Sequence, residues 1–350
     1  MLDAVARNRI AEAARTVLDG GQITRRQALD LIALEEPADI FELLAWTNRV
    51  RERFHGRRIR LCSILNIKAG GCPEDCKFCA QASRYATETP RHGLLDAESI
   101  LRAAAETRRY GVRGVALVAA WRGLEEGPLL DRLCEQFQLL ERKGKVQPHA
   151  SLGLIQNPRV ARRLYEAGVR CYNHNLETSR RFFPSQCTTH TYEDRLRTLR
   201  CLKAAGIRVC SGGVLGLGET REDRIDLAFA LRDLEADVVP INILNPIPGT
   251  PCENNPPLHP LEILKTVACF RLILPRQQIL VAGGRAVNLR DAQSLVFAAG
   301  ASALMVGNYL TTLNRPVEED LQMLRDLGLE PDFGPPSPDR EQAAVPRAAG

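Results

Sequence analysis

The run Arg60-Leu-Cys-Ser-Ile-Leu-Asn66 begins the repeating pattern that decides the fold. Seven more short apolar runs follow it, and segments with helical periodicity lie between them. The seven runs cover residues 114–120, 146–152, 171–176, 207–215, 238–244, 278–284 and 303–309. Strict alternation of strands and helices predicts a parallel sheet, and eight such units predict a closed (β/α)8 TIM-type barrel.

The segments between these runs contain signals for helices. We expect helices over residues 97–109, 158–167, 191–205, 220–234, 260–273 and 288–299. Thr191-Tyr-Glu-Asp194 and Thr220-Arg-Glu-Asp223 have the hydroxyl and carboxylate spacing of a helix N-terminus. A doubly wound open sheet is the alternative, but the first run is not followed by the Gly-x-Gly-x-x-Gly sequence typical of dinucleotide-binding members of that class.

The two ends of the chain differ from the repeat. Thr24-Arg-Arg-Gln27 resembles a capping box, and a second helix is expected to begin at Pro37 and end at Gly56. The last twenty residues are rich in proline and charge, so we expect a disordered tail. The predicted organisation is an N-terminal helical segment at 1–56, the barrel at 57–330 and the tail at 331–350.

Composition excludes several classes of function. Lys and Arg total 47 against 42 Asp and Glu, and a net charge of +5 is too small to indicate nucleic acid or a membrane surface as a partner. No apolar run reaches membrane-spanning length, and Asp3 and Arg7 stand where a signal peptide would be apolar. We therefore expect a cytoplasmic protein, in which eleven cysteines indicate metal chemistry rather than disulfides.

Three cysteines lie close together in Cys72-Pro-Glu-Asp-Cys76-Lys-Phe-Cys79, directly after the first predicted strand. Active sites of such barrels lie at the carboxyl ends of the strands, so this loop is expected at the mouth. Three thiolates on one loop can hold three corners of a [4Fe–4S] cube and leave one iron open for another ligand. A structural zinc loop is the alternative, but zinc favours closed sets of four ligands, and no second Cys-x2-Cys pair occurs in the chain.

The fourth predicted strand carries polar residues that an apolar barrel strand should not have. Asn173, Asn175 and Glu177 are two residues apart, so a regular strand points all three to one face, while His174 points to the other. If their shared face is the lumen, they form a polar ladder that rises towards the mouth. The alternative is a structural polar plug that fills the barrel.

Several long strings resemble the biotin synthase family of the radical S-adenosylmethionine superfamily. They are GGCPEDCKFCAQASRY, YNHNLETS, TYEDRLRTL, VCSGGVLGLGET and VPINIL, and the similarity spans residues 40–330. The resemblance implies that the three loop cysteines ligate a [4Fe–4S] cluster that reduces S-adenosylmethionine. It implies that Phe78 lies beside the adenine, that Asn175 and Glu177 bind the ribose, and that Arg195 holds the methionine carboxylate.

The same resemblance implies the substrate and the reaction. Asn173 and Asn242 would hydrogen-bond the ureido ring of dethiobiotin, and an amide offers the donor and the acceptor that a cyclic urea needs. A 5′-deoxyadenosyl radical would abstract hydrogen from dethiobiotin, and sulfur from an auxiliary cluster would close the ring. Flavodoxin or ferredoxin would donate electrons, and the family leads us to expect a homodimer.

The auxiliary cluster is the point at which the chain departs from the family. The family's [2Fe–2S] ligands are three strand cysteines and one arginine, and only Cys210 matches them here, because the other positions hold Ala116, His149 and Leu280. We therefore expect Cys171, Cys187 and Cys210 to hold a cluster larger than [2Fe–2S], as in variant members of the family, with His149, Arg285 or sulfide completing it. The alternative is that Cys171 and Cys187 are packing thiols, as we expect for Cys62, Cys134, Cys201, Cys252 and Cys269.

Two other functions stay open from the sequence. The chain could be another radical S-adenosylmethionine enzyme of the same barrel type, such as a mutase or a maturase. It could also be a non-catalytic iron–sulfur carrier, which would not cleave S-adenosylmethionine.

Overall fold

The computed structural model describes residues 4–112, 114–308, 310–312 and 314–332. Its strands are β1 (Arg58–Lys68), β2 (Gly114–Ala119), β3 (Gln147–Ser151), β4 (Cys171–Asn173), β5 (Arg208–Cys210), β6 (Gly213–Leu215), β7 (Val238–Ile243), β8 (Gln278–Val281), β9 (Ala303–Met305) and β10 (Glu330–Asp332). All pairings are parallel and run in the order β1-β2-β3-β4-β5-β7-β8-β9, with β6 also paired to β7. Because β9 pairs with β1, the sheet closes into the predicted barrel.

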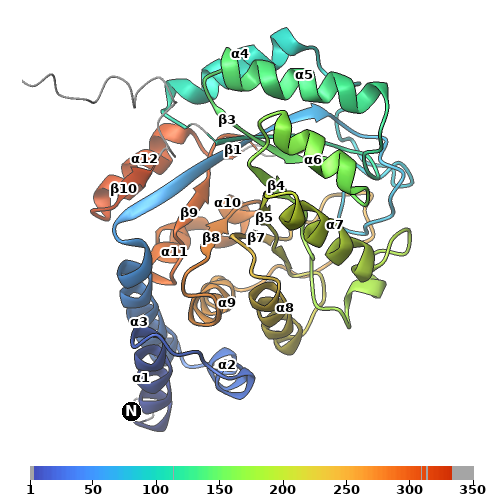
Figure 1. The fold of residues 1–350 in the computed structure, drawn as a ribbon. Coiled ribbons are helices and arrows are strands. Elements are labelled where there is room, and N and C mark those ends of the chain that lie inside the picture. The colour runs from blue at the N-terminus through green and yellow to red at the C-terminus, as the bar shows by residue number, and fades with distance from the viewer. Residues whose placement is uncertain (1–3, 113, 309, 313, 333–350) are drawn as a thin grey trace, which may run out of the picture.

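Helices surround the barrel on its outside (Figure 1). They are α1 (Ala4–Leu18), α2 (Arg25–Ile32), α3 (Pro37–His55), α4 (Ala97–Arg109), α5 (Pro128–Arg142), α6 (Pro158–Glu166), α7 (Tyr192–Ala204), α8 (Arg221–Asp233), α9 (Pro260–Ile273), α10 (Arg285–Leu289), α11 (Leu295–Ala298) and α12 (Val317–Asp326), with short 3₁₀ segments η1 (Phe183–Ser185) and η2 (Arg290–Ser294). None of the helices in the described ranges is both long and apolar enough to cross a bilayer.

Five of the six predicted helices are confirmed to within one residue at each end, as α4, α6, α7, α8 and α9. Both expected caps are present on α7 and α8, with Thr191 accepting from the amide of Asp194 and Thr220 from that of Asp223. The helix predicted over 288–299 is wrong, because this stretch divides into the end of α10, η2 and α11. Helices α5 and α12 complete the ring and were not in our predicted set.

The fifth predicted strand, 207–215, is interrupted between β5 and β6. The break lies at Ser211 and Gly212, where the chain approaches neighbouring backbone closely. A Cβ at Gly212 would lie 1.9 Å from the carbonyl oxygen of Pro240, and one at Gly213 would lie 2.3 Å from that of Glu177. These two glycines therefore allow the strands to pack closely.

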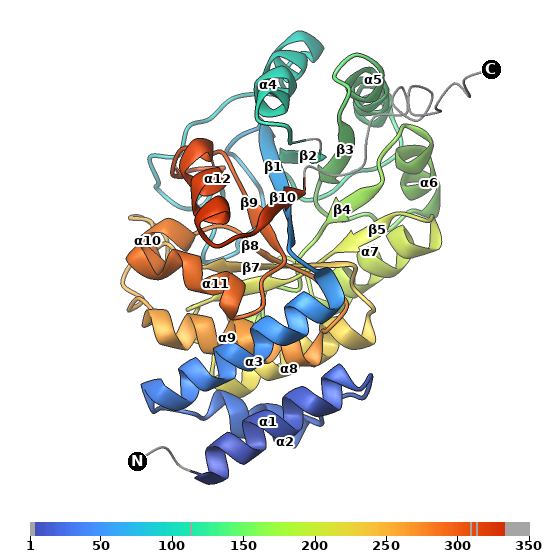
Figure 2. The same cartoon turned by 90° about the vertical axis from the view of Figure 1, so that its left-hand side faces the viewer.

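The N-terminal helices pack beneath α8 and α9 (Figure 2). The capping box at Thr24 and Gln27 is confirmed, as are the start of α3 at Pro37 and its end at Gly56, where φ is +63°. Lys265 on α9 donates to the carbonyl of Leu34 at 2.6 Å. The division of the chain at residue 56 stays a prediction.

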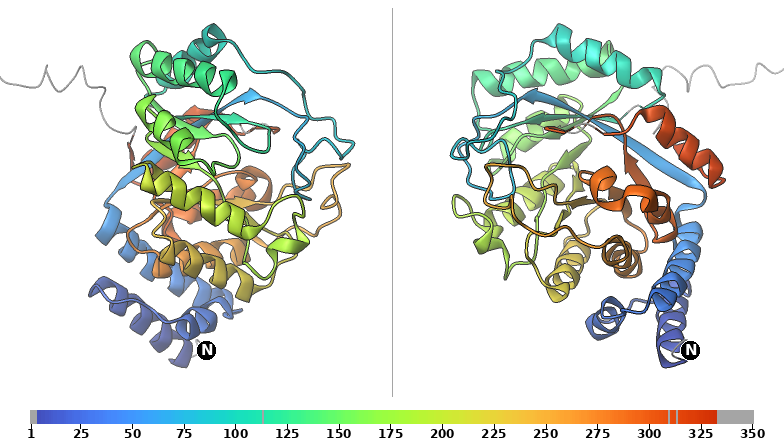
Figure 3. Two further views of the ribbon diagram at one scale, coloured as in Figure 1. Left: turned by 45° about the vertical axis from the view of Figure 1, so that its right-hand side comes forward. Right: turned by 180° about the vertical axis from the view of Figure 1, so that it is seen from behind.

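The C-terminal end of the described chain returns to the barrel. Strand β10 pairs beside the start of β1, the long strand seen from behind in Figure 3. Pro331 and Asp332 thus belong to a strand, although we had placed them in a disordered tail. The rest of that predicted tail, 333–350, lies outside the described residues, as does Tyr309 at the end of the eighth predicted strand.

Candidate active site

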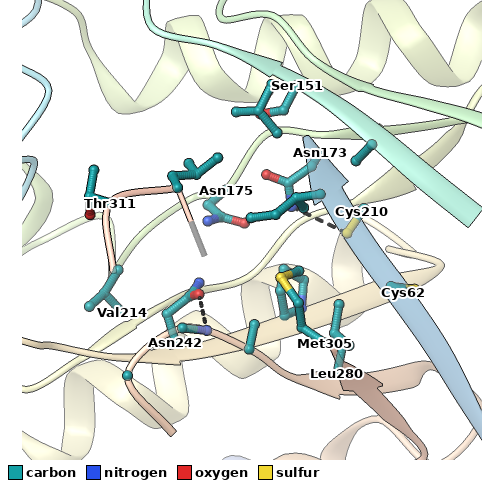
Figure 4. Close-up of a pocket in the computed structure, with 18 of the residues that line it drawn as sticks. Cys62, Ser151, Asn173, Asn175, Cys210, Val214, Asn242, Leu280, Met305 and Thr311 are labelled. Carbon is teal, nitrogen blue, oxygen red and sulfur yellow. Dashed lines mark hydrogen bonds between the residues drawn. The ribbon is translucent and has the colours of Figure 1, made fainter. Parts of the chain in front are cut away.

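A cavity of about 320 Å³ lies inside the barrel. Its wall includes the polar ladder of β4 and the segment that follows it, Asn173, Asn175 and Glu177, together with Asn242 from β7. Figure 4 shows the three asparagines between Cys62 at one end and Thr311 at the other. The predicted common face is therefore confirmed, and these side chains line an open space instead of plugging the barrel.

The asparagines are fixed by hydrogen bonds to their neighbours. Asn173 donates to the sulfur of Cys210 at 3.3 Å, and Asn175 accepts from the amide of Gly212 at 3.2 Å. Asn242 accepts from the amide of Gly283 at 3.0 Å (Figure 4). Amides held in this way present fixed donors and acceptors to a ligand, which favours specific recognition over loose packing.

Glu177 stands where the ladder reaches the mouth. Its φ is +70°, an unusual conformation for a residue with a side chain, and its backbone bridges to Gly213. Burial raises the pKa of its carboxyl group, and its Oε2 has no hydrogen-bond partner among the described residues. A buried carboxylate oxygen without a partner is costly, so a ligand hydroxyl that filled this position would be stabilising.

The three-cysteine loop is held in shape by its own backbone. The amide of Cys72 donates to the carbonyl of Gln81 at 2.9 Å, and the amide of Cys79 donates to that of Cys76 at 3.0 Å. Burial raises the pKa of Cys72, and it raises that of Cys79 to about 11. These thiols keep their protons near neutral pH until a metal displaces them.

The two acidic residues between the first two loop cysteines are tied to the segment 187–190. Asp75 accepts from the backbone amides of Thr188 at 2.9 Å and Thr189 at 3.1 Å. Glu74 accepts from Thr189 and from His190. Hydrogen bonds from amides and hydroxyls hold the pKa of Asp75 well below its usual range, although burial opposes them. The segment 187–190 therefore holds the three-cysteine loop through its two carboxylates, and we call this segment the clamp.

Cys187 lies in this clamp. Its sulfur is 3.8 Å from that of Cys76 and 3.2 Å from Oδ1 of Asp75. The hydrogen bond with Cys76 lowers the pKa of Cys187 to about 4, and it raises the pKa of Cys76. The structure thus places Cys187 beside the loop and not with Cys171 and Cys210, so our grouping of these three thiols around one cluster is corrected.

The ligand atoms of Cys76, Cys187 and His190 lie within 4.8 Å of one another, a spacing that could hold one metal ion. Both ring nitrogens of His190 already have partners, however. Nδ1 lies within hydrogen-bond distance of Glu74, and Nε2 lies 3.0 Å from Nε of Arg195. We therefore assign His190 to hydrogen bonding and not to metal ligation.

Arg195, from α7, is buried and points towards the loop. Its Nη1 donates to the carbonyl of Asn175 at 2.6 Å and to Glu177 at 3.2 Å. Its Nη2 lies 4.0 Å from the sulfur of Cys76 and has no oxygen acceptor among the residues that the structure describes. A guanidinium that is held on two sides and open on the third is suited to bind a carboxylate beside the loop.

A second group of thiols lies deeper in the cavity, and Cys62, Cys171 and Cys210 make it up. They come from β1, β4 and β5. Cys171 and Cys210 share a hydrogen bond, which raises the pKa of Cys210 and lowers that of Cys171. Burial raises the pKa of Cys62 as well. We had predicted Cys62 to be a packing thiol, but it shares this cavity wall with the other two.

Basic and imidazole side chains surround this deeper group. Burial and the charges of Arg60 and Arg208 lower the pKa of His149 to about 3, so its ring is neutral and able to bind metal at neutral pH. Ala116 and Leu280 also line the cavity, and neither can ligate iron. Arg285 is not a ligand candidate, because its buried guanidinium pairs with Asp320 at 2.9 and 3.0 Å.

The sequence contained a signal for Cys62 that we did not use. Arg60, Cys62 and Ile64 alternate along β1, and all three line the cavity, so their parity points them to the lumen. No comparable signal marked His190, because its role depends on contacts with residues 116 and 5 positions away in the sequence.

Two family models match the chain. Residues 66–231 match the radical SAM superfamily, and residues 240–330 match the biotin and thiamin synthesis associated domain. The first region contains both thiol groups except Cys62, together with Arg195 and the polar ladder.

Similar proteins include the biotin synthases of three bacteria. That of Carboxydothermus hydrogenoformans is 47% identical over 324 residues, 92% of this chain and 99% of the relative. That of Heliobacterium modesticaldum is 48% identical over 91% of this chain and 98% of its own length. That of Geotalea daltonii is 46% identical over 89% of this chain and 94% of the relative.

Solved structures of other enzymes have the same fold. Methylornithine synthase has a TM-score of 0.79 at 22% identity, covering 94% of this chain and 99% of that one. A maturase of the [FeFe]-hydrogenase has a TM-score of 0.80 at 18% identity, and the match covers 94% of this chain and 76% of the maturase. At this identity the likeness concerns the fold alone.

Proposed function

The chain belongs to the biotin synthase family, and from this premise we propose which of its residues carry the insertion of sulfur into dethiobiotin. Membership rests on identities of 44–48% over about nine-tenths of the chain. Its radical SAM region makes it a radical S-adenosylmethionine enzyme. The assignments below concern individual residues of this chain.

We assign Cys72, Cys76 and Cys79 to the [4Fe–4S] cluster. Three thiols on one preformed loop at the barrel mouth fit three corners of a cube and leave the fourth iron open. Bound there, the cluster would supply the electron that cleaves S-adenosylmethionine. The residues of segment 187–190 hold the loop through Glu74 and Asp75.

The position of the Arg195 side chain beside Cys76 is the main support for the proposal. Its Nη2 contacts the sulfur of Cys76 at 4.0 Å and has no oxygen acceptor among the described residues, so a methionine carboxylate bound to it would lie next to the open corner of the cluster. The unpartnered Oε2 of Glu177 and the amide of Asn175 are suited to ribose hydroxyls. Phe78 lines the same cavity and offers an aromatic face to the adenine.

Asn173 and Asn242 are assigned to dethiobiotin. Both line the cavity, Asn173 from β4 and Asn242 from β7. Each amide can donate to a urea carbonyl and accept from a urea nitrogen. Their protein hydrogen bonds to Cys210 and Gly283 fix the orientation in which they meet the ring.

We revise the auxiliary site to Cys62, Cys171 and Cys210, with His149 as the fourth ligand candidate. A cluster held there would supply the sulfur. Asn173 donates directly to the sulfur of Cys210, which supports a short path from a substrate on Asn173 to this site. Arg60 and Arg208 add positive charge that favours an anionic cluster. Whether the cluster is larger than [2Fe–2S] stays a prediction.

The expected partners also stay predictions, namely flavodoxin or ferredoxin as electron donor and a second copy of the chain in a homodimer. We propose a cytoplasmic location, because all eleven cysteines are free thiols and a reducing compartment keeps such thiols reduced.

Anaerobic reconstitution with iron and sulfide tests the proposal. Under dithionite the enzyme should cleave S-adenosylmethionine to methionine and 5′-deoxyadenosine, and with dethiobiotin it should form biotin. Cleavage without biotin formation would indicate a different radical enzyme of this barrel type. Cluster binding without cleavage would indicate a non-catalytic carrier.

A further inference from the structure

His190 connects the cluster-binding loop to Arg195. It lies in the segment between η1 and α7, and it is 7% exposed. One ring nitrogen contacts Glu74, which lies between the loop cysteines, and the other contacts Nε of Arg195. The side chains of Glu74, His190 and Arg195 thus form a continuous line of hydrogen bonds, although Glu74 is distant from the other two in the sequence.

The directions of these hydrogen bonds follow from their donors. An arginine Nε always carries a hydrogen and cannot accept, so Nε2 of His190 must be the acceptor at 3.0 Å. The neutral ring then carries its proton on Nδ1, which donates to the carboxylate of Glu74. This tautomer gives each ring nitrogen of His190 a partner, and the sulfur of Cys187 also lies 3.3 Å from Nδ1.

The remaining contacts of Arg195 leave it little freedom. Its guanidinium carbon lies 5.2 Å from the ring centroid of Phe183, whose ring lies 5.7 Å from that of His190. Nη1 is bound to Asn175 and Glu177, and Nε to His190. Nη2 has only the sulfur of Cys76, at 4.0 Å, as a partner among the described residues, so it can still bind a ligand oxygen. Without His190, Nε would lose its acceptor, and the side chain could rotate away from Cys76.

We propose that His190 is a positioning residue that fixes Arg195 for the carboxylate of S-adenosylmethionine and ties that orientation to the cluster-binding loop through Glu74. The proposal rests on the role proposed for Arg195. Holding the guanidinium in its binding orientation before the ligand arrives lowers the conformational entropy lost on binding. His190 itself does not touch the ligand.

The test compares two ligands on cluster-loaded, anaerobic enzyme without reductant. S-adenosylmethionine carries the carboxylate, and decarboxylated S-adenosylmethionine lacks it but keeps the amine, the sulfonium and the nucleoside. Dissociation constants are measured for both with wild type and with His190→Phe, His190→Gln and Arg195→Gln. Tyr192→Phe is the matched control, since it removes a buried hydroxyl that has no partner among the described residues from a ring beside Phe183.

We expect His190→Phe to weaken S-adenosylmethionine binding by about tenfold, because one buried hydrogen bond to a charged group is lost. The decarboxylated ligand should change by less than about twofold. His190→Gln should restore most of the affinity, since a glutamine can accept from Arg195 and donate to Glu74. Tyr192→Phe should match wild type, and iron content measured in each variant should equal that of wild type.

Equal losses for both ligands in His190→Phe would mean a general structural defect and would overturn the proposal, as would unchanged binding of S-adenosylmethionine. Arg195→Gln distinguishes the role proposed for Arg195 from the role proposed for His190. If it alters the preference for the carboxylate while His190→Phe does not, only the role of His190 is wrong. If it leaves that preference unchanged, the role proposed for Arg195 is wrong and the role of His190 falls with it.

Discussion

The two groups of thiols in this enzyme differ in the elements that carry them and in the charge of their neighbours. Cys72, Cys76 and Cys79 lie on one loop at the mouth, beside the acidic residues Glu74 and Asp75. The deeper group comes from three separate strands and lies among arginine side chains. We call them the rim group and the floor group.

The difference shows how each site achieves rigidity. A loop has no sheet to hold it, so the rim group depends on the clamp at 187–190, which places hydroxyl, amide and imidazole donors on the two carboxylates. Strands are already fixed by their neighbours in the barrel, so the floor group needs no clamp and is surrounded by positive charge instead. The predictions that follow separate the two groups, beginning with the largest effect.

Cys76→Ala should abolish cleavage of S-adenosylmethionine, because two thiolates cannot hold the cube at the rim. The barrel should stay folded, since Cys76 lies on a loop outside the strands. The measurement is 5′-deoxyadenosine production under dithionite, with circular dichroism as the check on folding. Cys201→Ala, at a half-buried thiol of α7, is the control and should keep activity. Deoxyadenosine production by Cys76→Ala would contradict the rim assignment.

Replacing Cys171 and Cys210 by serine should remove the iron of the floor group and stop biotin formation. Cleavage of S-adenosylmethionine should persist, because the rim thiols are untouched. Iron and sulfide per chain, measured after anaerobic reconstitution, report the loss.

Two single variants sharpen this result. Cys62→Ser should lower iron content in the same way, whereas Cys187→Ser should leave the floor iron in place, because Cys187 lies beside Cys76. Loss of floor iron in Cys187→Ser would restore the grouping that the sequence suggested. Full iron content and biotin formation in the double variant would make the floor cysteines packing residues.

Asn242→Leu should weaken dethiobiotin binding more than S-adenosylmethionine binding. Removing this partly buried amide leaves a polar group of the bound urea ring without its partner, which costs about 1–3 kcal/mol, or roughly 5- to 150-fold in affinity. Asn242 lies on β7, away from the rim loop. Separate titrations of the two ligands decide the matter, and an equal loss for both would refute the substrate role.

Thr189→Val should have the smallest effect. It removes a hydroxyl that lies within hydrogen-bond distance of two carboxylates, those of Glu74 and of Asp75, the latter at 3.0 Å, but leaves the backbone donor of the same residue in place. A loss of about 1 kcal/mol in clamp stability is expected. It should appear as faster removal of rim iron by a chelator, with floor iron unchanged. Thr107→Val, on the distant helix α4, is the control; equal rates for both variants would argue against the clamp.

The regular parts of the fold were predictable because their signals are local. The helix caps at Thr191 and Thr220 depend on residues three positions apart, and the parity of Asn173 and Asn175 depends on residues two apart. The break between β5 and β6 was not predictable, because it depends on how closely Gly212 approaches Pro240 on another strand.

The candidate site shows the same difference between features with local sequence signals and features that depend on long-range contacts. The amino-acid sequence by itself determined the rim group, since a cluster-binding loop needs three thiols at short spacing and the chain provides them contiguously. Only the tertiary structure decided the floor group, moved Cys187 to the rim and placed His190 against Arg195. Barrel closure brings β1 beside β9 and faces Cys62 towards Cys171 across the lumen, a proximity that no sequence spacing encodes.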